Sequence, residues 1–176
     1  EISTVVDVAQ ENGCRDLVLL HCISSYPAPP EQSNLRTIPD LKERFGVLSG
    51  LSDHTMGTTV ALSSVALGAC VIEKHFTLSR NDKGPDSEFS LEPHELKELC
   101  EDTKVAYLSL GAASYELKDA EKSNLNFRRS LYAVKDIKKG ELFTKENFRS
   151  IRPAFGLSPE YYQKVMGSIA AKDIES

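Results

Sequence analysis

The sequence predicts an α/β fold, with a parallel sheet in the longer first part of the chain and a small mixed domain at the end. Short apolar runs alternate with segments of helical periodicity, and the strands begin about 25 residues apart. The composition then changes to charged and small residues at 112–127. We expect residues 1–111 to form the α/β unit, residues 112–127 a linker, and residues 128–176 the small domain.

The first unit of this alternation combines a helix at residues 2–12 with a strand at residues 16–23. Apolar residues recur at helical spacing from the second residue onward, and Gly13 follows where a left-handed residue commonly ends a helix. The run Leu17–Leu20 is short and continuous, which is typical of a strand buried on both faces.

The next two units repeat this pattern. Residues 34–45 carry an apolar helical stripe, in which Pro39 is expected to shorten the first turn, and residues 47–51 follow as a strand. A helix of small residues at 58–67 precedes the third strand, at 69–73. Each strand ends in a polar cluster, and parallel strands end at one edge. In an α/β barrel that edge carries the active site.

A long polar segment and a helix complete the α/β unit. Residues 74–92 carry Gly84-Pro85-Asp86 and are predicted to form a functional loop. Pro93 stands where a helix favours its first residue, and Gly111 stands just past the end of the apolar pattern. The sequence therefore predicts a helix over 93–110.

The small domain is predicted to begin with a strand at residues 130–134, where polar and apolar residues alternate. Lys139-Gly140 marks a turn, and Thr144 can cap a short helical turn. Ser158-Pro159-Glu160 opens a further helix, which Gly167 ends.

The composition excludes several classes of protein. A net charge of −5 and an isoelectric point near 5.4 argue against a broad nucleic-acid surface. The apolar stretches are far shorter than the roughly 20 residues of a membrane span, and the first ten residues lack the features of a signal peptide. We therefore expect a cytoplasmic protein with no membrane or nucleic-acid partner. The sequence has no CxxC pair, so we expect reduced and mostly buried thiols at Cys14, Cys22, Cys70 and Cys100.

Two histidines follow neighbouring strands of the predicted sheet. Ser52-Asp53-His54 ends one strand, and Glu73-Lys74-His75 ends the next. Two imidazoles in these positions can face one point and hold a divalent cation, leaving coordination positions for water and substrate. Alternatively, each histidine only hydrogen-bonds the backbone at its strand end. The spacing of the two motifs does not by itself decide between these interpretations.

Three further side chains near these strand ends could serve the same site. Consecutive strand residues point to opposite sides, so Glu73 shares the face of His75 while Lys74 lies behind it, where we expect an ion pair. Asp86 suits hydrogen bonds from sugar hydroxyls, or is only part of a solvated turn. Tyr26 can stack on a sugar or cover the core.

Four ordered motifs together resemble the sialic acid synthase family. They are His21–Pro29, Gly50–Thr55, Gly68–Leu78 and Gly84–Pro93. The tail, from Arg128 onward, resembles the antifreeze-like (SAF) domain that ends these enzymes. The resemblance implies that residues 1–111 are the C-terminal part of a TIM (β/α)8 barrel, and that residues 128–176 form a small SAF (β-clip) domain truncated at its end.

The same resemblance implies a transferase of carbohydrate biosynthesis that forms a carbon–carbon bond. Such enzymes condense phosphoenolpyruvate with an N-acetylated amino-sugar aldehyde and release phosphate. Within the family, Ser114–Leu117 and Ser150–Leu157 look most like pseudaminic acid synthases, whose sugar is a 2,4-diacetamido-trideoxy-hexose. N-acetylneuraminate (sialic acid) and legionaminate synthases are the alternatives.

The resemblance also implies a metal site. A divalent cation, Mn²⁺ or Mg²⁺, is expected on His54 and His75, where it would polarise the sugar aldehyde. Glu73 and His75 are the expected catalytic residues, and Glu73 would also contact the sugar.

Substrate-binding roles follow from the resemblance residue by residue. Ser24 and Ser52 are expected to hold phosphoenolpyruvate, while Tyr26 and Asp86 contact the sugar. Sialic acid synthases often have asparagine at the position of Ser24, so this residue favours another product. Arg152 is expected to reach the partner's barrel in a domain-swapped homodimer.

Length is the largest departure from the family. Its members begin with about five more of the eight barrel strands, which supply the lysines that grip phosphate. We therefore expect part of an enzyme that is inactive alone. The alternative is a non-catalytic fragment that retains sugar or metal binding and dimer contacts.

Overall fold

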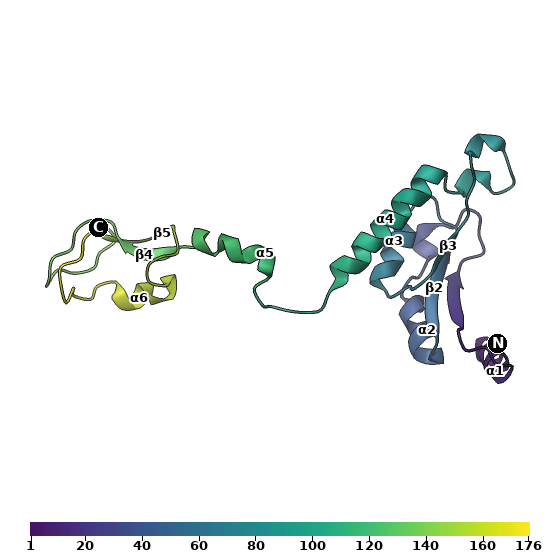
Figure 1. Cartoon of the computed structure of the whole chain (residues 1–176), viewed down its shortest axis with the longest axis horizontal. Coiled ribbons are helices and arrows are strands. Elements are labelled where there is room, and N and C mark those ends of the chain that lie inside the picture. The colour runs from purple at the N-terminus through teal and green to yellow at the C-terminus, as the bar shows by residue number, and fades with distance from the viewer. The chain divides into compact units, whose positions relative to one another are not determined.

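The computed structural model describes residues 1–176, which divide into two compact units, Glu1–Ala112 and Ala113–Ser176 (Figure 1). The helices and strands of the first unit are α1 (Ile2–Glu11), β1 (Val18–Cys22), α2 (Thr37–Phe45), β2 (Leu48–Asp53), α3 (Thr59–Ala66), β3 (Ile72–Lys74) and α4 (Pro93–Leu110). Short 3-10 turns lie at Pro30–Gln32, Arg80–Asp82 and Ser87–Phe89.

The first unit contains the predicted parallel sheet, in the order β1-β2-β3. Because βαβ crossovers are right-handed, successive units that step in one direction place their helices on one face of the sheet. Accordingly, α2 packs against β1 and β2, while α3 packs against β2 and α4 (Figure 1). We call the helix-covered side the outer face and the opposite side the inner face.

The inner face of the sheet is uncovered. Cys22 pairs with Ser52, which pairs with Glu73, so these residues lie in one row across the strands. Leu48 points the same way as Ser52, because alternate residues share a face. Cys22, Leu48 and Glu73 are all exposed. The sheet thus lacks a second layer on the side that carries the row.

The core lies between the sheet and the last two helices. Ala61 of α3 and Leu99 of α4 are buried together with Leu91, and Ile72 and Leu96 pack against them. This cluster fixes α4 against β3, and it therefore sets where the loop between them begins and ends.

Helix α4 has the bounds predicted from its end signals. Pro93 occupies the first turn and Gly111 follows the last residue. The Glu95 carboxylate accepts a hydrogen bond from the Glu92 backbone N–H at 2.8 Å, as one half of a capping box. The predicted helix at 34–45 begins later, at Thr37, so Pro39 lies in its first turn.

The third strand is shorter than the predicted range 69–73 and ends one residue later. Backbone bonding to β2 does start early, since the Cys70 N–H donates to the Ser49 carbonyl and Val71 accepts from the Leu51 N–H. The regular ladder covers only Ile72–Lys74. A run of apolar residues therefore located the strand without defining its ends.

The expectation of mostly buried thiols is wrong, because Cys14, Cys22, Cys70 and Cys100 are all exposed. Cys22 lies on the uncovered inner face. Cys70 and Cys100 line an open groove beside β3. These thiols are exposed because the surfaces that carry them have no neighbour within the unit. The cysteines are free and form no disulfide.

The second unit contains α5 (Asp119–Lys122), β4 (Ser130–Ala133), β5 (Phe148–Ile151) and α6 (Tyr162–Val165). Two 3-10 turns lie at Ser123–Phe127 and Pro159–Tyr161. Strands β4 and β5 pair antiparallel. The segment 112–127, expected as a linker, therefore carries α5 and a 3-10 turn. The buried apolar residues of this unit are Leu131, Ile137, Phe148 and Ala170.

None of the helices combines the length and the apolar character that crossing a membrane requires.

Candidate active site

The two histidines singled out in the sequence lie side by side. His54 follows β2 and His75 follows β3, and their ring centroids are 5.1 Å apart with an interplanar angle of 69°. Parallel strands β2 and β3 are neighbours, so their carboxyl ends bring these rings to one edge of the sheet. The arrangement allows two imidazole nitrogens to converge on one ligand.

The backbone around the site fixes the orientation of His54, which is only 6% exposed. Its Nδ1 lies 2.9 Å from the Ile23 carbonyl oxygen. A carbonyl oxygen only accepts hydrogen bonds, so Nδ1 carries the hydrogen, and the lone pair of the neutral ring is on Nε2. The His54 carbonyl in turn accepts from the Ala28 N–H at 2.9 Å. One nitrogen thus remains available to a ligand.

His75 is held from a different direction. Its carbonyl accepts from the Leu91 N–H at 2.8 Å, which brings the end of the long loop back beside β3. Its Nδ1 lies 3.6 Å from an Asp86 carboxylate oxygen, which is longer than a hydrogen bond. Asp86 is half-exposed and lies next to the histidine pair.

Ser52 and Glu73 lie together on the inner face. The Ser52 hydroxyl donates to the Glu73 carboxylate at 2.7 Å. Each lies two positions before a histidine of the pair, at the same ladder position on β2 and β3. The buried hydroxyl of Ser52 and the exposed carboxylate of Glu73 therefore extend the site from the histidines along the inner face of the sheet.

Aromatic rings border the histidines. The Tyr26 ring centroid lies 4.3 Å from that of His54 and 5.9 Å from that of His75. Phe89 packs 4.9 Å from His75 and 5.6 Å from Tyr26. We did not predict Phe89 from the sequence. It comes three residues after Asp86 in a polar loop, and only the return of that loop brings it to the site.

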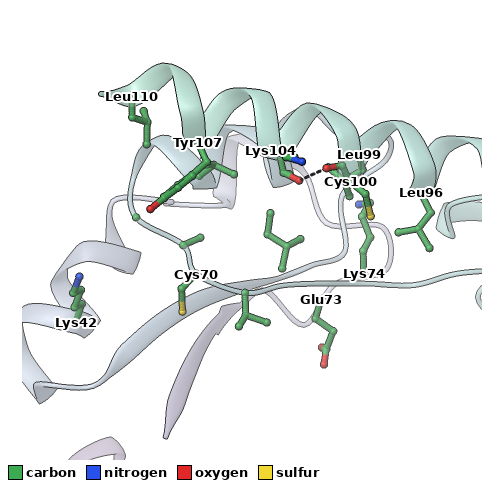
Figure 2. A pocket seen from close by; sticks show the side chains of 16 residues that line it. Lys42, Cys70, Glu73, Lys74, Leu96, Leu99, Cys100, Lys104, Tyr107 and Leu110 are labelled. Atoms are coloured by element: carbon green, nitrogen blue, oxygen red, sulfur yellow. Dashed lines mark hydrogen bonds between the residues drawn. The ribbon is translucent and has the colours of Figure 1, made fainter. Parts of the chain in front are cut away.

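Behind the site, Lys74 forms the predicted ion pair. Its ammonium lies 2.8 Å from an Asp53 carboxylate oxygen, and the two side chains are 3% and 1% exposed. Figure 2 shows Lys74 pointing toward α4 and Glu73 pointing the opposite way. Ser52 and Glu73 therefore face the site, while their neighbours Asp53 and Lys74 face the helices on the outer face.

Two of the predicted site residues, Ser24 and Arg152, remain to be placed. Ser24 is exposed and follows Ile23, whose carbonyl oxygen contacts His54. Arg152 is exposed and directly follows β5 in the second unit. The Tyr132 hydroxyl holds the backbone beyond it, since it donates to the Pro153 carbonyl and accepts from the Phe155 N–H.

A second group of potential metal ligands, Glu92, His94 and Glu95, lies at the start of α4, with ligand atoms within 4.8 Å of one another. Its carboxylates already have a cation, because Arg80 forms two hydrogen bonds with Glu95 and lies 3.8 Å from Glu92. The hydrogen bonds from Arg80 lower the pKa of Glu95 below its ordinary value. We interpret this group as the anchor of the loop.

A groove of about 1100 Å³ lies between β3 and α4, and neither His54 nor His75 lines it (Figure 2). Its lining is mostly apolar and includes Ile72, Leu96, Leu99 and Tyr107. A groove of this composition, on the open edge of a sheet, fits a further packed element rather than a polar substrate.

Comparisons with known proteins identify the family of the chain. A model of the NeuB family matches residues 1–115, and a model of the SAF domain matches residues 128–176. A pseudaminic acid synthase of Campylobacter jejuni is 45% identical over 99% of this chain and 51% of its own length. An N,N'-diacetyllegionaminic acid synthase of the same species is also 45% identical, over 98% of this chain and 53% of its own length.

A solved structure gives the same assignment. The N-acetylneuraminic acid (sialic acid) synthetase of Leptospira borgpetersenii, in complex with citrate, aligns with a TM-score of 0.63 and 37% identity. The match covers 70% of this chain and 43% of that chain. The chain spans about half the length of the curated relatives it matches. Because the family model matches well over half of its length, the chain belongs to the NeuB family and carries a SAF domain at residues 128–176.

Proposed function

We propose that this chain forms the C-terminal half of a nonulosonic acid synthase, most specifically a pseudaminic acid synthase. The observation that carries the proposal is the convergence of His54 and His75 beside Ser52 and Glu73, at the carboxyl ends of β2 and β3. Active sites of α/β barrels are built at that edge. The motifs at 114–117 and 150–157 favour pseudaminic acid over the equally similar legionaminic acid synthases.

In the proposed reaction, carbon 3 of phosphoenolpyruvate attacks the aldehyde carbon of a 2,4-diacetamido-trideoxy-hexose. Water adds at carbon 2, and phosphate leaves by carbon–oxygen cleavage. Glu73 is suited to accept a proton, because it is a carboxylate whose position the Ser52 hydroxyl fixes. Ser24 and Ser52 would hold phosphoenolpyruvate, and Asp86 would accept hydrogen bonds from sugar hydroxyls.

The residues of the site fit a divalent cation. His54 has its Nδ1 committed to the Ile23 carbonyl, which leaves Nε2 as a ligand, and His75 and Asp86 stand beside it. Imidazole ligands suit Mn²⁺ better than Mg²⁺, which prefers oxygen, so we propose Mn²⁺. When bound, the ion would supply Lewis-acid polarisation of the sugar aldehyde. Tyr26 would cover this centre and stack on the sugar.

We further propose that the three strands are part of a (β/α)8 barrel. Helices on one face support this, because the helices of such a barrel lie outside its sheet. The uncovered inner face and the open groove beside β3 support it too, because closing the barrel would cover both. The remaining strands would come from the part of the relatives that this chain does not span. Residues 1–111 would then be barrel, 112–127 the connection, and 128–176 the SAF domain.

The assembly and location are also proposals. Arg152, on the loop that Tyr132 holds, would enter the barrel mouth of a partner subunit in a homodimer. We place this biosynthetic enzyme in the cytoplasm. Without the other barrel strands the chain would retain metal and sugar binding but would not turn over phosphoenolpyruvate, since the lysines that grip phosphate would be missing.

The metal assignment can be tested on the histidines. His54→Ala and His75→Ala should each lower Mn²⁺ affinity by at least 100-fold in this chain, because each removes one of two imidazole ligands. Electron paramagnetic resonance of free Mn²⁺ gives the affinity. His94→Ala, in the Arg80-neutralised group, is the matched control and should bind as the parent does. Equal loss from His94→Ala would move the metal site to the start of α4.

The sugar assignment can be tested on Asp86, with the other barrel strands supplied. Asp86→Ala should raise the Michaelis constant for the sugar about tenfold, as expected for the loss of charge-assisted hydrogen bonds, and leave that for phosphoenolpyruvate nearly unchanged. Phosphate release is measured with the amino sugars of pseudaminic, legionaminic and sialic acid synthases in turn. An effect confined to phosphoenolpyruvate would contradict the role of Asp86. Turnover with another of the three sugars would correct the product.

A further inference from the structure

The two motifs that end β2 and β3 each contain a charged residue on the outer face. Asp53 lies between Ser52 and His54, and Lys74 lies between Glu73 and His75. The ladder places Asp53 directly opposite Lys74. Neither can reach a ligand on the inner face, because adjacent strand residues point to opposite sides. The chemistry proposed above therefore leaves both without a role.

These two side chains form a closed hydrogen-bond network with the residue after His54. The Lys74 ammonium donates to an Asp53 carboxylate oxygen at 2.8 Å and to the Thr55 carbonyl at 2.7 Å. The other Asp53 oxygen accepts from the Thr55 N–H at 2.9 Å. The residues on both sides of His54 are thereby tied to the residue that precedes His75.

The network is nearly closed to solvent, with Lys74 and Asp53 at 3% and 1% exposure. Burying two charges costs free energy, and apolar side chains of similar size often stabilise a fold as well or better. Water cannot replace a lost partner at this depth, so the three bonds restrict how β2 and β3 can move relative to each other. A buried pair in this position is suited to fixing geometry.

The restraint extends to the segment that follows β1. The His54 carbonyl accepts from the Ala28 N–H, and its Nδ1 contacts the Ile23 carbonyl oxygen. A shift of His54 would therefore disturb the segment that carries Tyr26. Small displacements matter here, because a metal ligand must lie within a few tenths of an ångström of its bond length.

We propose that Asp53 and Lys74 are positioning residues, which lock the ends of β2 and β3 so that His54 and His75 converge on one cation. The proposal rests on the proposed function for the identity of the ligand. The restraint on the two strand ends is independent of that function.

The test compares Lys74→Met in the 176-residue chain with Ile38→Ala, which empties a fully buried position of α2 that is not part of the network. Hydrogen exchange of the Ala28 and Thr55 amides reports on the lock without metal. Mn²⁺ titration reports on the histidines. The two variants are compared at equal loss of thermal stability. Relative to Ile38→Ala, Lys74→Met should speed hydrogen exchange of both amides. It should also lower Mn²⁺ affinity by at least tenfold, as the loss of a residue that supports a metal ligand does.

Two further variants keep the outcome decisive. Lys74→Arg retains the charge and should recover part of the affinity. Asp53→Asn with Lys74→Met removes both charges; it should fold even if Lys74→Met alone does not, and should still bind Mn²⁺ weakly. Exchange and affinity in either Lys74→Met variant equal to those of Ile38→Ala would overturn the proposal. Provided that His54→Ala shows the histidines to bind Mn²⁺, a change in only one of the two measurements would overturn it as well.

Failure of the proposed function would look different. If His54→Ala binds Mn²⁺ as the parent chain does, the metal site is wrong. The exchange rates at Ala28 and Thr55 then decide alone whether Asp53 and Lys74 lock the strand ends, since these amides respond to the backbone and not to the ion.

Discussion

Two ionic clusters bracket the loop that follows β3, and they differ in burial. At its start, Lys74 and Asp53 are almost completely buried. At its end, Arg80 meets Glu92 and Glu95, all between 24% and 37% exposed. The charges of a buried ion pair have no water to bind if they separate, so the pair keeps one geometry. In a partly exposed pair, water can replace either partner. The first cluster thus fixes the positions of the strand ends. The second cluster holds the loop, and the strength of its ion pairs varies with pH and salt.

The largest effect should follow from breaking the buried pair. Lys74→Met is expected to reduce the free energy of unfolding by about 3–5 kcal/mol, because it leaves the Asp53 carboxylate buried without a cation. Urea unfolding followed by circular dichroism measures the change. Adding Asp53→Asn should restore most of the loss, since it removes the stranded charge. A loss below about 1 kcal/mol would remove the difference between the two clusters.

A smaller effect is expected at the second cluster. Glu95→Gln keeps an oxygen for the Glu92 N–H but removes the charge that Arg80 contacts, so it should cost about 0.5–1 kcal/mol at neutral pH. The matched control is Glu98→Gln, on an exposed part of α4 with no ion pair, which should change little.

The pH dependence sharpens this comparison. Arg80 depresses the pKa of Glu95 in the folded state, so the stabilisation is complete above the unfolded value of about 4.3 and is lost as pH falls through the lower folded value. The stability difference between parent chain and Glu95→Gln should therefore vanish in acid. A difference that persists at pH 2 would show that the role of Glu95 is packing.

The smallest effect is expected for a fully solvated pair on α2. Arg44 and Asp40 form two hydrogen bonds but remain 65% and 52% exposed. Arg44→Met should leave the urea midpoint unchanged within measurement error, because water replaces the lost contact. A midpoint shift comparable to that of Glu95→Gln would mean that the burial of an ion pair does not determine how much it contributes to stability.

Much of the site follows from strand periodicity. The alternation along Glu73-Lys74-His75 predicted that Lys74 would form an ion pair behind the site, and this is confirmed. That Glu73 shares a face with His75 stays a prediction. The end signals around α4 predicted its bounds because Pro93 and Gly111 act locally. Patterns of this kind need no knowledge of which segments meet.

Features that depend on tertiary contact were missed. The Ile23 carbonyl that orients His54 leaves no mark in the sequence, since every residue has a carbonyl. Phe89 reaches the histidines only through the return of the loop at Leu91. The exposure of Cys22 and Cys70 depends on what covers the sheet, which periodicity does not reveal. The assigned roles of Ser24 and Arg152 remain predictions.

The alternation at the two strand ends also bears on how such a site could be redesigned. Positions 52, 54, 73 and 75 present donor atoms, while the interleaved Asp53 and Lys74 hold the backbone beneath them. A library that varies only those four positions would sample donor sets for other ions on an unchanged frame. Varying all six positions of Ser52–His54 and Glu73–His75 together would lose most members to misfolding before their chemistry could be selected.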